Sequence, residues 1–142
     1  MTDYGLITGD VFEDERGTLR FVNSFDMAQI VRFYEISPKS QDVIRAWQGH
    51  QHEKKWFYCL SGTFVINLVK IDNFINPSDQ LVSKKIELNS KTPAILEVPG
   101  GYATGIKASS EDSRLQVFSN FGLQESAADD FRFPSEKWSA EW

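Results

Sequence analysis

The two histidines of the chain, His50 and His52, stand within three residues of each other. An imidazole has an ordinary pKa of about 6.5, so it takes up and releases protons at neutral pH, and its neutral form is a common metal ligand. Alternate residues of an extended strand share a face, so both imidazoles would point to one side. The spacing indicates a metal site or a site of proton transfer, and the alternative is a solvated face on an exposed edge strand.

The residues around the histidines extend this pattern. If the segment 48–58 is one strand, the face of His50 and His52 also carries four further side chains: Gln48, Lys54, Trp56 and Tyr58. A face with two imidazoles, an ammonium group and two aromatic rings is typical of the wall of a polar pocket. A β-bulge at Gly49 would change which of these residues point inward.

The rest of the chain predicts a β-rich scaffold for this segment. Its 142 residues, 41% of them hydrophobic, fit one domain over residues 1–142. Short runs of β-branched and aromatic residues alternate with turn residues, which is typical of a sandwich or barrel. The predicted strands are 18–25, 29–36, 42–46, 50–60, 63–71, 80–88, 94–98 and 114–121, with one short helix within 125–131. Trp138 and Trp142 are expected to cover a barrel end or a partner subunit.

Charge and composition exclude several classes of function. Fifteen Lys and Arg against twenty Asp and Glu give a net charge of −5, which argues against a nucleic-acid partner. The longest uncharged stretch, 56–69, is too short to span a membrane, and no basic residue precedes Arg16 to start a signal peptide. The single cysteine, Cys59, fits a reducing compartment, so we expect a cytoplasmic protein.

The histidine segment resembles the metal-binding motif of the cupins. That motif has His-x-His, a glutamate four or five residues later, a glycine that closes the hairpin, and a late Pro-x-Gly-x-x-His. This chain supplies the two histidines, Gly62 and the segment 99–101. The resemblance implies an all-β fold of the cupin type, a double-stranded β-helix or jelly-roll barrel with at most a short C-terminal helix.

Two of the four metal ligands of that motif are absent. Trp56 and Phe57 stand where the glutamate belongs, and Thr104 stands in place of the late histidine. Two histidines alone would hold zinc or iron weakly. We therefore predict a cupin barrel with no metal and no other cofactor, and a metal-dependent dioxygenase or isomerase is the least favoured reading.

The chain is most similar to the metal-free cupins that act on nucleotide-linked 4-keto-6-deoxy sugars. These are the dTDP-4-dehydrorhamnose 3,5-epimerases and the dTDP-sugar 3,4-ketoisomerases. Their Asp-x-Arg-Gly turn appears around Arg16, and the ketoisomerase Arg-x-Tyr strand appears as Arg32-Phe33-Tyr34. Eleven residues after that tyrosine, Arg45 matches the arginine of the Arg-Gly-x-His-x-His-Lys motif. The segments 99–102, 117–121 and 129–131 resemble the C-terminal pattern of the group.

The same alignment shows where this chain departs from the group. Gln48 replaces the first histidine of the motif, His50 matches the second, and His52 is additional. In the 3,5-epimerases the first histidine is the base, and a tyrosine of a late strand is the opposing acid. This chain has Phe118 and Phe121 in the late strand, so it lacks the acid that epimerisation at two faces needs. A 3,4-ketoisomerase moves a proton along one face and needs a single shuttle.

The resemblance implies an isomerase or epimerase of a dTDP-linked 4-keto-6-deoxyhexose, used in making surface polysaccharide sugars and most like a 3,4-ketoisomerase. His50 is then the proton shuttle, with His52 and Tyr34 as further catalytic residues. Arg45, Lys54 or His52 would donate a hydrogen bond to the developing oxyanion. Arg16, Arg32 and Arg45 would bind the diphosphate of the nucleotide. Gln48 and Tyr102 complete the expected substrate contacts.

Two further expectations accompany this reading. The relatives are dimers, often with an exchanged N-terminal strand, so we expect a homodimer. The alternative function is a non-catalytic cupin that binds a sugar nucleotide or carbohydrate, which the loss of titratable groups at Gln48, Thr104 and Phe121 favours.

Overall fold

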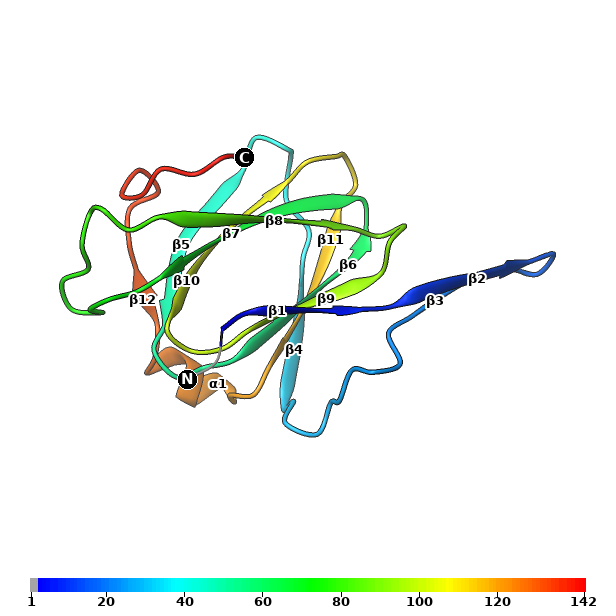
Figure 1. Ribbon diagram of the computed structural model, residues 1–142, viewed down its shortest axis with the longest axis horizontal. Coiled ribbons are helices and arrows are strands. Elements are labelled where there is room, and N and C mark those ends of the chain that lie inside the picture. Colours follow the sequence, from blue (N-terminus) through cyan, green and yellow to red (C-terminus); the bar gives the residue numbers. More distant parts are fainter. Residues whose placement is uncertain (1–2) are drawn as a thin grey trace.

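A computed structural model describes residues 3–142 as two five-stranded antiparallel sheets that face each other (Figure 1). The first sheet has the order β1 (Gly5–Thr8), β9 (Ala94–Val98), β6 (Lys55–Ser61), β11 (Arg114–Ser119) and β4 (Arg32–Ile36). The second has the order β12 (Phe131–Arg132), β5 (Ile44–His50), β10 (Tyr102–Ala108), β7 (Thr63–Lys70) and β8 (Ser83–Asn89). One short helix, α1 (Leu123–Ala127), follows β11. The prediction of an all-β fold with a single short helix is confirmed.

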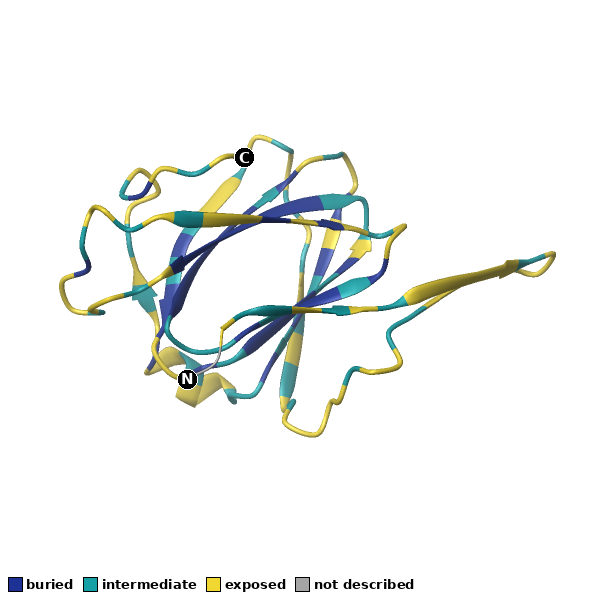
Figure 2. Cartoon of the chain, viewed as in Figure 1, coloured by how far each residue is buried: buried dark blue, intermediate teal, exposed yellow. Residues whose placement is uncertain are grey.

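The main core fills the space between the two sheets. Alternate side chains of the strands point inward there, and the buried strand segments in Figure 2 mark this interior. Burying an aliphatic or phenylalanine side chain contributes roughly 1.5–3 kcal/mol. The largest fully buried aliphatic and phenylalanine side chains of this core are Phe57, Phe64, Ile66, Leu68, Leu96, Leu115 and Val117.

A second apolar layer lies on the outer face of β5, β10 and β7, under the C-terminal segment. Trp138 packs edge-on against Trp47 at 5.6 Å, and Trp142 lies 5.9 Å from the same ring. The indole N–H of Trp138 donates to the carbonyl of Ser78 at 2.8 Å. The two C-terminal tryptophans therefore cover a sheet face of their own chain, and the expectation that they cover a barrel end or a partner subunit is wrong.

A β-hairpin extends away from the barrel near the N-terminus (Figure 1). It consists of β2 (Asp10–Asp14) and β3 (Gly17–Phe21), with Arg16 in its turn. Phe12 and Leu19 pair across the hairpin and are 54% and 60% exposed. The hairpin thus carries apolar side chains into solvent.

Several strands of the structure were not predicted, or begin at other residues than predicted, because their residue composition is not typical of strands. The predicted strands 63–71 and 94–98 correspond to β7 and β9, but β1, β2, β10 and β12 were not predicted. Strand β10 is rich in small residues because both of its faces are covered, and Gly105 lies directly under Trp142. The strand predicted over 50–60 begins only at Lys55, and the helix lies at 123–127 rather than within 125–131. Within residues 3–142, no helix is long and apolar enough to cross a membrane.

Gly100 lets two backbone segments approach each other at the end of the barrel. A Cβ at this position would lie 2.5 Å from the carbonyl oxygen of Gln51 and 2.8 Å from Cα of His52. We predict that Gly100→Ala lowers the free energy of unfolding by about 1–3 kcal/mol, because backbone must move. Gly5→Ala, which meets nothing within 4 Å, is the control. Equal midpoints of urea unfolding for the two variants would contradict this close approach.

Candidate active site

The turn between β5 and β6 is fixed by one carboxylate. The side chain of Asp129 accepts hydrogen bonds from the backbone N–H groups of Gln51, His52 and Glu53, each at 2.8 Å. Burial alone would raise the pKa of the Asp129 carboxyl, but these three hydrogen bonds outweigh it and hold the pKa below its usual range. The ionised side chain of Asp129, which follows α1, therefore holds the turn in place.

This turn changes which residues point into the barrel. Gln48 of β5 and Lys55 of β6 both line the interior cavity, so the inward positions change from even to odd numbers across the turn. His52 is exposed in the turn, while Lys54 pairs with Glu97 at 3.4 Å. The prediction that residues 48, 50, 52, 54, 56 and 58 share one face is therefore wrong, because the segment is not one continuous strand.

The candidate site is a cavity of about 410 Å³ between the two sheets. Its volume lies within the ~300–1,000 Å³ usual for small-molecule sites. The structure brings together three of the predicted residues here, Tyr34, Arg45 and Gln48, and adds others that the sequence reasoning missed. The added polar lining residues are Lys55, Thr104 and Arg132, and the apolar walls include Ile36, Ile44, Phe57 and Ile106.

Lys55 and Tyr34 form a pair in this cavity. Lys55 is 5% exposed, and its ammonium group donates a hydrogen bond to the Tyr34 hydroxyl at 3.1 Å. The guanidinium of Arg32 lies 5.3 Å from the centre of the Tyr34 ring. Sequence reasoning missed Lys55 because a continuous strand would have turned it away from the histidines.

His50 lies at the end of β5 and is 4% exposed. Its Nδ1 is 2.8 Å from the carbonyl oxygen of Asp129. A carbonyl only accepts, so this contact places the proton on Nδ1 and leaves a lone pair on Nε2. Nε2 is buried and has no hydrogen-bond partner among residues 3–142. His50 follows Gln48 by two positions in β5, so its side chain is on the same, inward face.

The surroundings of His50 favour the neutral imidazole. Burial lowers the pKa of His50 below 6.5, and the positive charge of Lys55 lowers it further. The Asp129 carbonyl and the Glu53 carboxylate act in the opposite direction, but the net shift is downward. A neutral imidazole with a free Nε2 lone pair can accept a proton.

A second buried group, Glu53, connects β11, α1 and β4. Its carboxylate is fully buried and accepts hydrogen bonds from Ser119 of β11 at 2.5 Å and Ser126 of α1 at 2.8 Å. Arg32 of β4 completes the cluster at 3.1 Å, with 22% of its side chain exposed. Arg32 is therefore held by Glu53 rather than free in the cavity, and no feature of the sequence had marked Glu53.

The remaining predicted residues lie in different places. Arg16 is exposed in the hairpin turn and pairs with Asp14 at 2.7 Å. Tyr102 is buried and its hydroxyl donates to the carboxylate of Asp3 at 3.0 Å, away from the cavity. Gln48 donates to Asp130 at 3.1 Å from the cavity wall. Among residues 3–142, no three His, Cys, Asp or Glu side chains are grouped so that they could hold a metal ion.

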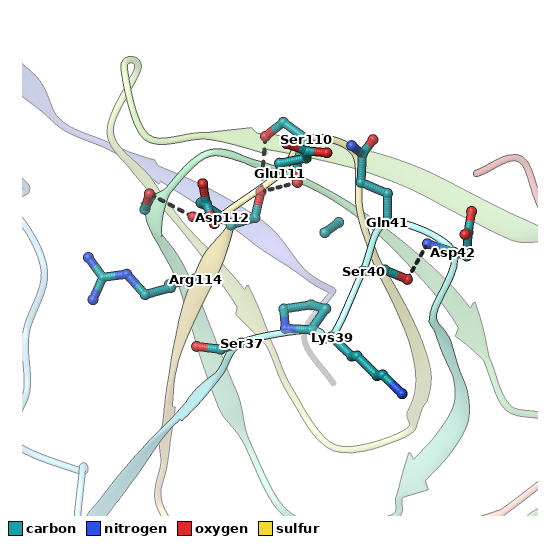
Figure 3. Close-up of a pocket in the computed structure, with 13 residues that line it drawn as sticks. Ser37, Lys39, Ser40, Gln41, Asp42, Ser110, Glu111, Asp112 and Arg114 are labelled. Atoms are coloured by element: carbon teal, nitrogen blue, oxygen red, sulfur yellow. Dashed lines mark hydrogen bonds between the residues drawn. The ribbon is translucent and has the colours of Figure 1, made fainter.

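A larger cavity, of about 810 Å³, lies in the loops 37–42 and 110–114 (Figure 3). Serines and charged residues line it, and the hydroxyl oxygens of Ser110 and Ser113 lie 3.0 Å apart. The side chains of Lys39 and Arg114 point away from each other (Figure 3). It does not hold the Lys55–Tyr34 pair. His50 lines neither cavity, but it is on the inward face of β5, the strand that lines the smaller cavity, and the charge of Lys55 acts on it. We therefore place the chemistry in the smaller cavity between the sheets.

The state of His50 can be tested directly. We predict that His52→Gln, which leaves His50 as the chain's one histidine, shows an Nδ1–H tautomer and a pKa below 6.5 by ¹H–¹⁵N NMR. Because the unfolded chain binds this proton more readily, neutral His50 contributes stability fully above pH 6.5. That contribution is lost as the pH falls from 6.5 towards the folded-state pKa. A proton on Nε2, or a pKa above 6.5, would contradict the geometry.

Comparison with solved structures identifies the fold. The chain is similar to the QdtA sugar 3,4-ketoisomerase from Thermoanaerobacterium thermosaccharolyticum in complex with TDP, with a TM-score of 0.70, 23% identity and coverage of 95% and 91% of the two chains. It also resembles the WlaRB TDP-quinovose 3,4-ketoisomerase from Campylobacter jejuni, with a TM-score of 0.69, 20% identity and coverage of 96% and 98%.

A third similar structure comes from the epimerases. The dTDP-4-dehydrorhamnose 3,5-epimerase from Elizabethkingia anophelis has a TM-score of 0.74, 20% identity and coverage of 99% of this chain and 81% of that chain. No model of a protein family and no curated protein matches the sequence. The chain has the cupin-type jelly-roll fold of the dTDP-sugar 3,4-ketoisomerases and 3,5-epimerases, as the sequence resemblance predicted.

Proposed function

We propose that the protein is an isomerase or epimerase of a dTDP-linked 4-keto-6-deoxyhexose, most like a 3,4-ketoisomerase. The observation that carries the proposal is a buried neutral imidazole, His50, on the inward face of β5, the strand that lines the cavity of Tyr34 and Lys55. The similar structures support it, because they include enzymes of both kinds with this fold.

The proposed reaction needs a base and a donor to oxygen. A hydrogen on C3 is acidified by the neighbouring C4 ketone, and Nε2 of His50 accepts it as the enediolate forms. The proton on Nε2 can exchange with solvent, and His50 then gives a proton back to C3 or passes it to C4, in the latter case while the hydroxyl proton moves from O3 to O4. A 3-hydroxy-4-ketone thus becomes a 3-keto-4-alcohol with no change in atoms or electrons. General base catalysis of this kind contributes typically ~10²–10⁴-fold to the rate.

Arginines at the cavity suit the diphosphate of the nucleotide. Arg45 and Arg132 both line the cavity. A guanidinium group can donate two parallel hydrogen bonds to the oxygens of one phosphate. Arg32 is engaged with Glu53, so we assign it a role in positioning the Tyr34 ring. Arg16 is in the turn of the projecting hairpin, away from the cavity of its own chain. It would therefore contact a nucleotide bound in the cavity of a second copy of the chain.

We also propose a homodimer held by this hairpin. Phe12 and Leu19 on the hairpin are exposed, and Phe33 on the outer face of β4 is 68% exposed beside Phe118. A second copy would remove these apolar surfaces from water. The single cysteine supports a cytoplasmic location, and the resemblance supports a role in making sugars for surface polysaccharides.

The second candidate function is a non-catalytic cupin that binds a sugar nucleotide. One observation favours it, namely that Gln48, which stands in place of the first histidine of the motif described above, lines the cavity. Its amide donates to Asp130 and cannot accept a proton at neutral pH. Such a protein would bind dTDP tightly in calorimetry and leave the hydrogens of the sugar unexchanged.

The proposed reaction predicts hydrogen exchange with solvent. We expect the protein to incorporate deuterium from D₂O into dTDP-4-keto-6-deoxyglucose at C3, and to form a new ketosugar, followed by proton NMR. His50→Asn should abolish the exchange, because an amide is no base, and leave dTDP affinity nearly unchanged. Absence of deuterium at C3 and C5, together with no new ketosugar, would refute the enzymatic function.

The dimer predicts a change of mass in solution. We expect light scattering to give twice the chain mass, and the double substitution Phe12→Asp and Leu19→Asp to give the monomer mass, because the charges prevent burial of the hairpin. Ile75→Asp, at an 87% exposed loop position away from the hairpin, should leave the dimer intact. A monomeric wild-type protein would contradict the proposal.

A further inference from the structure

Gln48 lies in a row of polar side chains that crosses the inner face of the second sheet. In the register of the strands it is opposite Arg132 of β12 on one side and Thr104 of β10 on the other. Residues directly opposite each other on antiparallel strands point to the same face of a sheet. All three side chains line the cavity. From the edge strand β12 inward, the row therefore presents a guanidinium group, an amide and a hydroxyl group to a ligand.

The carboxylate of Asp130 fixes the orientation of the Gln48 amide. Nε2 of Gln48 donates to Oδ1 of Asp130 at 3.1 Å, and Nε of Arg132 donates to the same oxygen at 2.7 Å. Burial alone would raise the pKa of the Asp130 carboxyl, but the hydrogen bonds from Arg132 and Gln48 outweigh it and hold the pKa below its usual range. An ionised carboxylate only accepts hydrogen bonds, so the NH₂ group of Gln48 must face it.

This orientation leaves the side-chain carbonyl oxygen of Gln48 available to a ligand. Among residues 3–142, no group donates a hydrogen bond to Oε1, and the hydroxyl of Thr104 is directed at the backbone oxygen of Gln48, 3.5 Å away. A histidine at this position would titrate near neutral pH, whereas an amide does not. The chain therefore presents a fixed hydrogen-bond acceptor here, which can bind a hydroxyl group but cannot take up a proton.

The chemistry of the proposed substrate indicates which hydroxyl group meets this oxygen. A 4-keto-6-deoxyhexose has free hydroxyl groups at C2 and C3, and C3 is a reacting carbon. The C2 hydroxyl is unchanged by the reaction and stands next to C1, which bears the diphosphate. Arg132 donates to Asp130 through Nε, so its Nη atoms remain available to phosphate oxygens. Cross-strand neighbours lie ~4.5–5.5 Å apart at Cβ, so one ligand can contact Arg132 with its diphosphate and Gln48 with its C2 hydroxyl.

We propose that Gln48 is a specificity-determining residue, whose Oε1 accepts a hydrogen bond from the C2 hydroxyl of the hexose. Asp130 is then a positioning residue, because it holds the amide without contacting the sugar. This inference rests on the proposed function and names the group of the substrate that the cavity recognises. The protein should prefer sugars with a hydrogen-bond donor at C2 over 2-deoxy sugars.

The test uses three stable nucleotide sugars that differ only at C2, in isothermal titration calorimetry. They are dTDP-glucose, dTDP-2-deoxyglucose and dTDP-2-deoxy-2-fluoroglucose. We expect the wild-type protein to bind dTDP-glucose about tenfold more tightly than the 2-deoxy sugar, as for the loss of one hydrogen bond. Fluorine cannot donate, so the 2-fluoro sugar should bind as weakly as the 2-deoxy sugar. Equal affinities for all three, or a 2-fluoro sugar that binds as tightly as dTDP-glucose, would overturn the proposal.

A substitution then assigns the preference to Gln48. Gln48→Met keeps the length of the side chain and removes its polar atoms, so it should weaken the binding of dTDP-glucose about tenfold. The affinity for dTDP-2-deoxyglucose should change little, because that sugar offers no donor to Oε1, and the preference should fall below about twofold. Gln80→Met, at an exposed glutamine between β7 and β8, should keep the full preference. A Gln48→Met variant that also keeps it would refute the assignment.

Two further measurements separate recognition from a structural role. Asp130→Ala lets the amide rotate, so it should also reduce the preference for the C2 hydroxyl. Gln48→Met should melt at nearly the wild-type temperature, because the Asp130 side chain is 32% exposed and water can replace the amide. A lower melting temperature, together with equally weakened binding of all three sugars, would show a structural role and overturn the proposal.

Kinetics separate binding from proton transfer. For deuterium exchange into dTDP-4-keto-6-deoxyglucose, we expect Gln48→Met to raise KM about tenfold and to change kcat less than about threefold. The amide binds the unreacting C2 hydroxyl equally in the ground state and the transition state, and such an interaction affects KM alone. A large loss of kcat at an unchanged KM would contradict the assignment.

The outcomes distinguish this proposal from the function on which it rests. A wild-type protein that prefers the C2 hydroxyl but exchanges no deuterium would refute the isomerase and support the role of Gln48. A protein that exchanges deuterium but binds the three sugars equally would refute the role of Gln48 alone. A protein that binds none of them would refute both.

Discussion

The hydrogen bonds of the Asp129 carboxylate are the constraint on which the site depends. Three successive backbone N–H groups point at one carboxylate, so the chain between β5 and β6 has little freedom. The carbonyl oxygen of the same residue accepts a hydrogen bond from Nδ1–H of His50. One residue thus sets both the path of the turn and the tautomer of the imidazole. Without it, neither the inward place of Lys55 nor the free lone pair of His50 follows.

The barrel divides its buried polar groups into two kinds. Glu53 is satisfied by two serine hydroxyls and Arg32, and this cluster closes the end of the barrel beside α1. Within the described part of the chain, Nε2 of His50 has no hydrogen-bond partner and Lys55 has no carboxylate partner. Groups of the first kind hold the fold, whereas groups of the second kind are available to a ligand.

Much of the fold follows from the sequence, and less of the site does. The turn at Gly62 and the strands around it are visible in the residue pattern, and the resemblance to metal-free cupins predicts the barrel and the inward place of Tyr34, Arg45 and Gln48. Strand β10 could not be predicted, because both of its faces are covered and its small residues show no alternation of apolar and polar side chains. The inward positions of Lys55 and Glu53 could not be predicted either, because they depend on hydrogen bonds to Asp129, which lies more than seventy residues later in the chain.

The central claim is that the sugar reacts in the cavity between the sheets. A crystal structure of the His50→Asn variant with dTDP-4-keto-6-deoxyglucose tests it most directly, because the substituted protein should bind the sugar without turning it over. We predict that the hexose ring lies between β4, β5, β6 and β10, with its ketone oxygen within hydrogen-bonding distance of Tyr34 and Lys55. A hexose ring bound in the loops 37–42 and 110–114, or elsewhere on the surface, would contradict it.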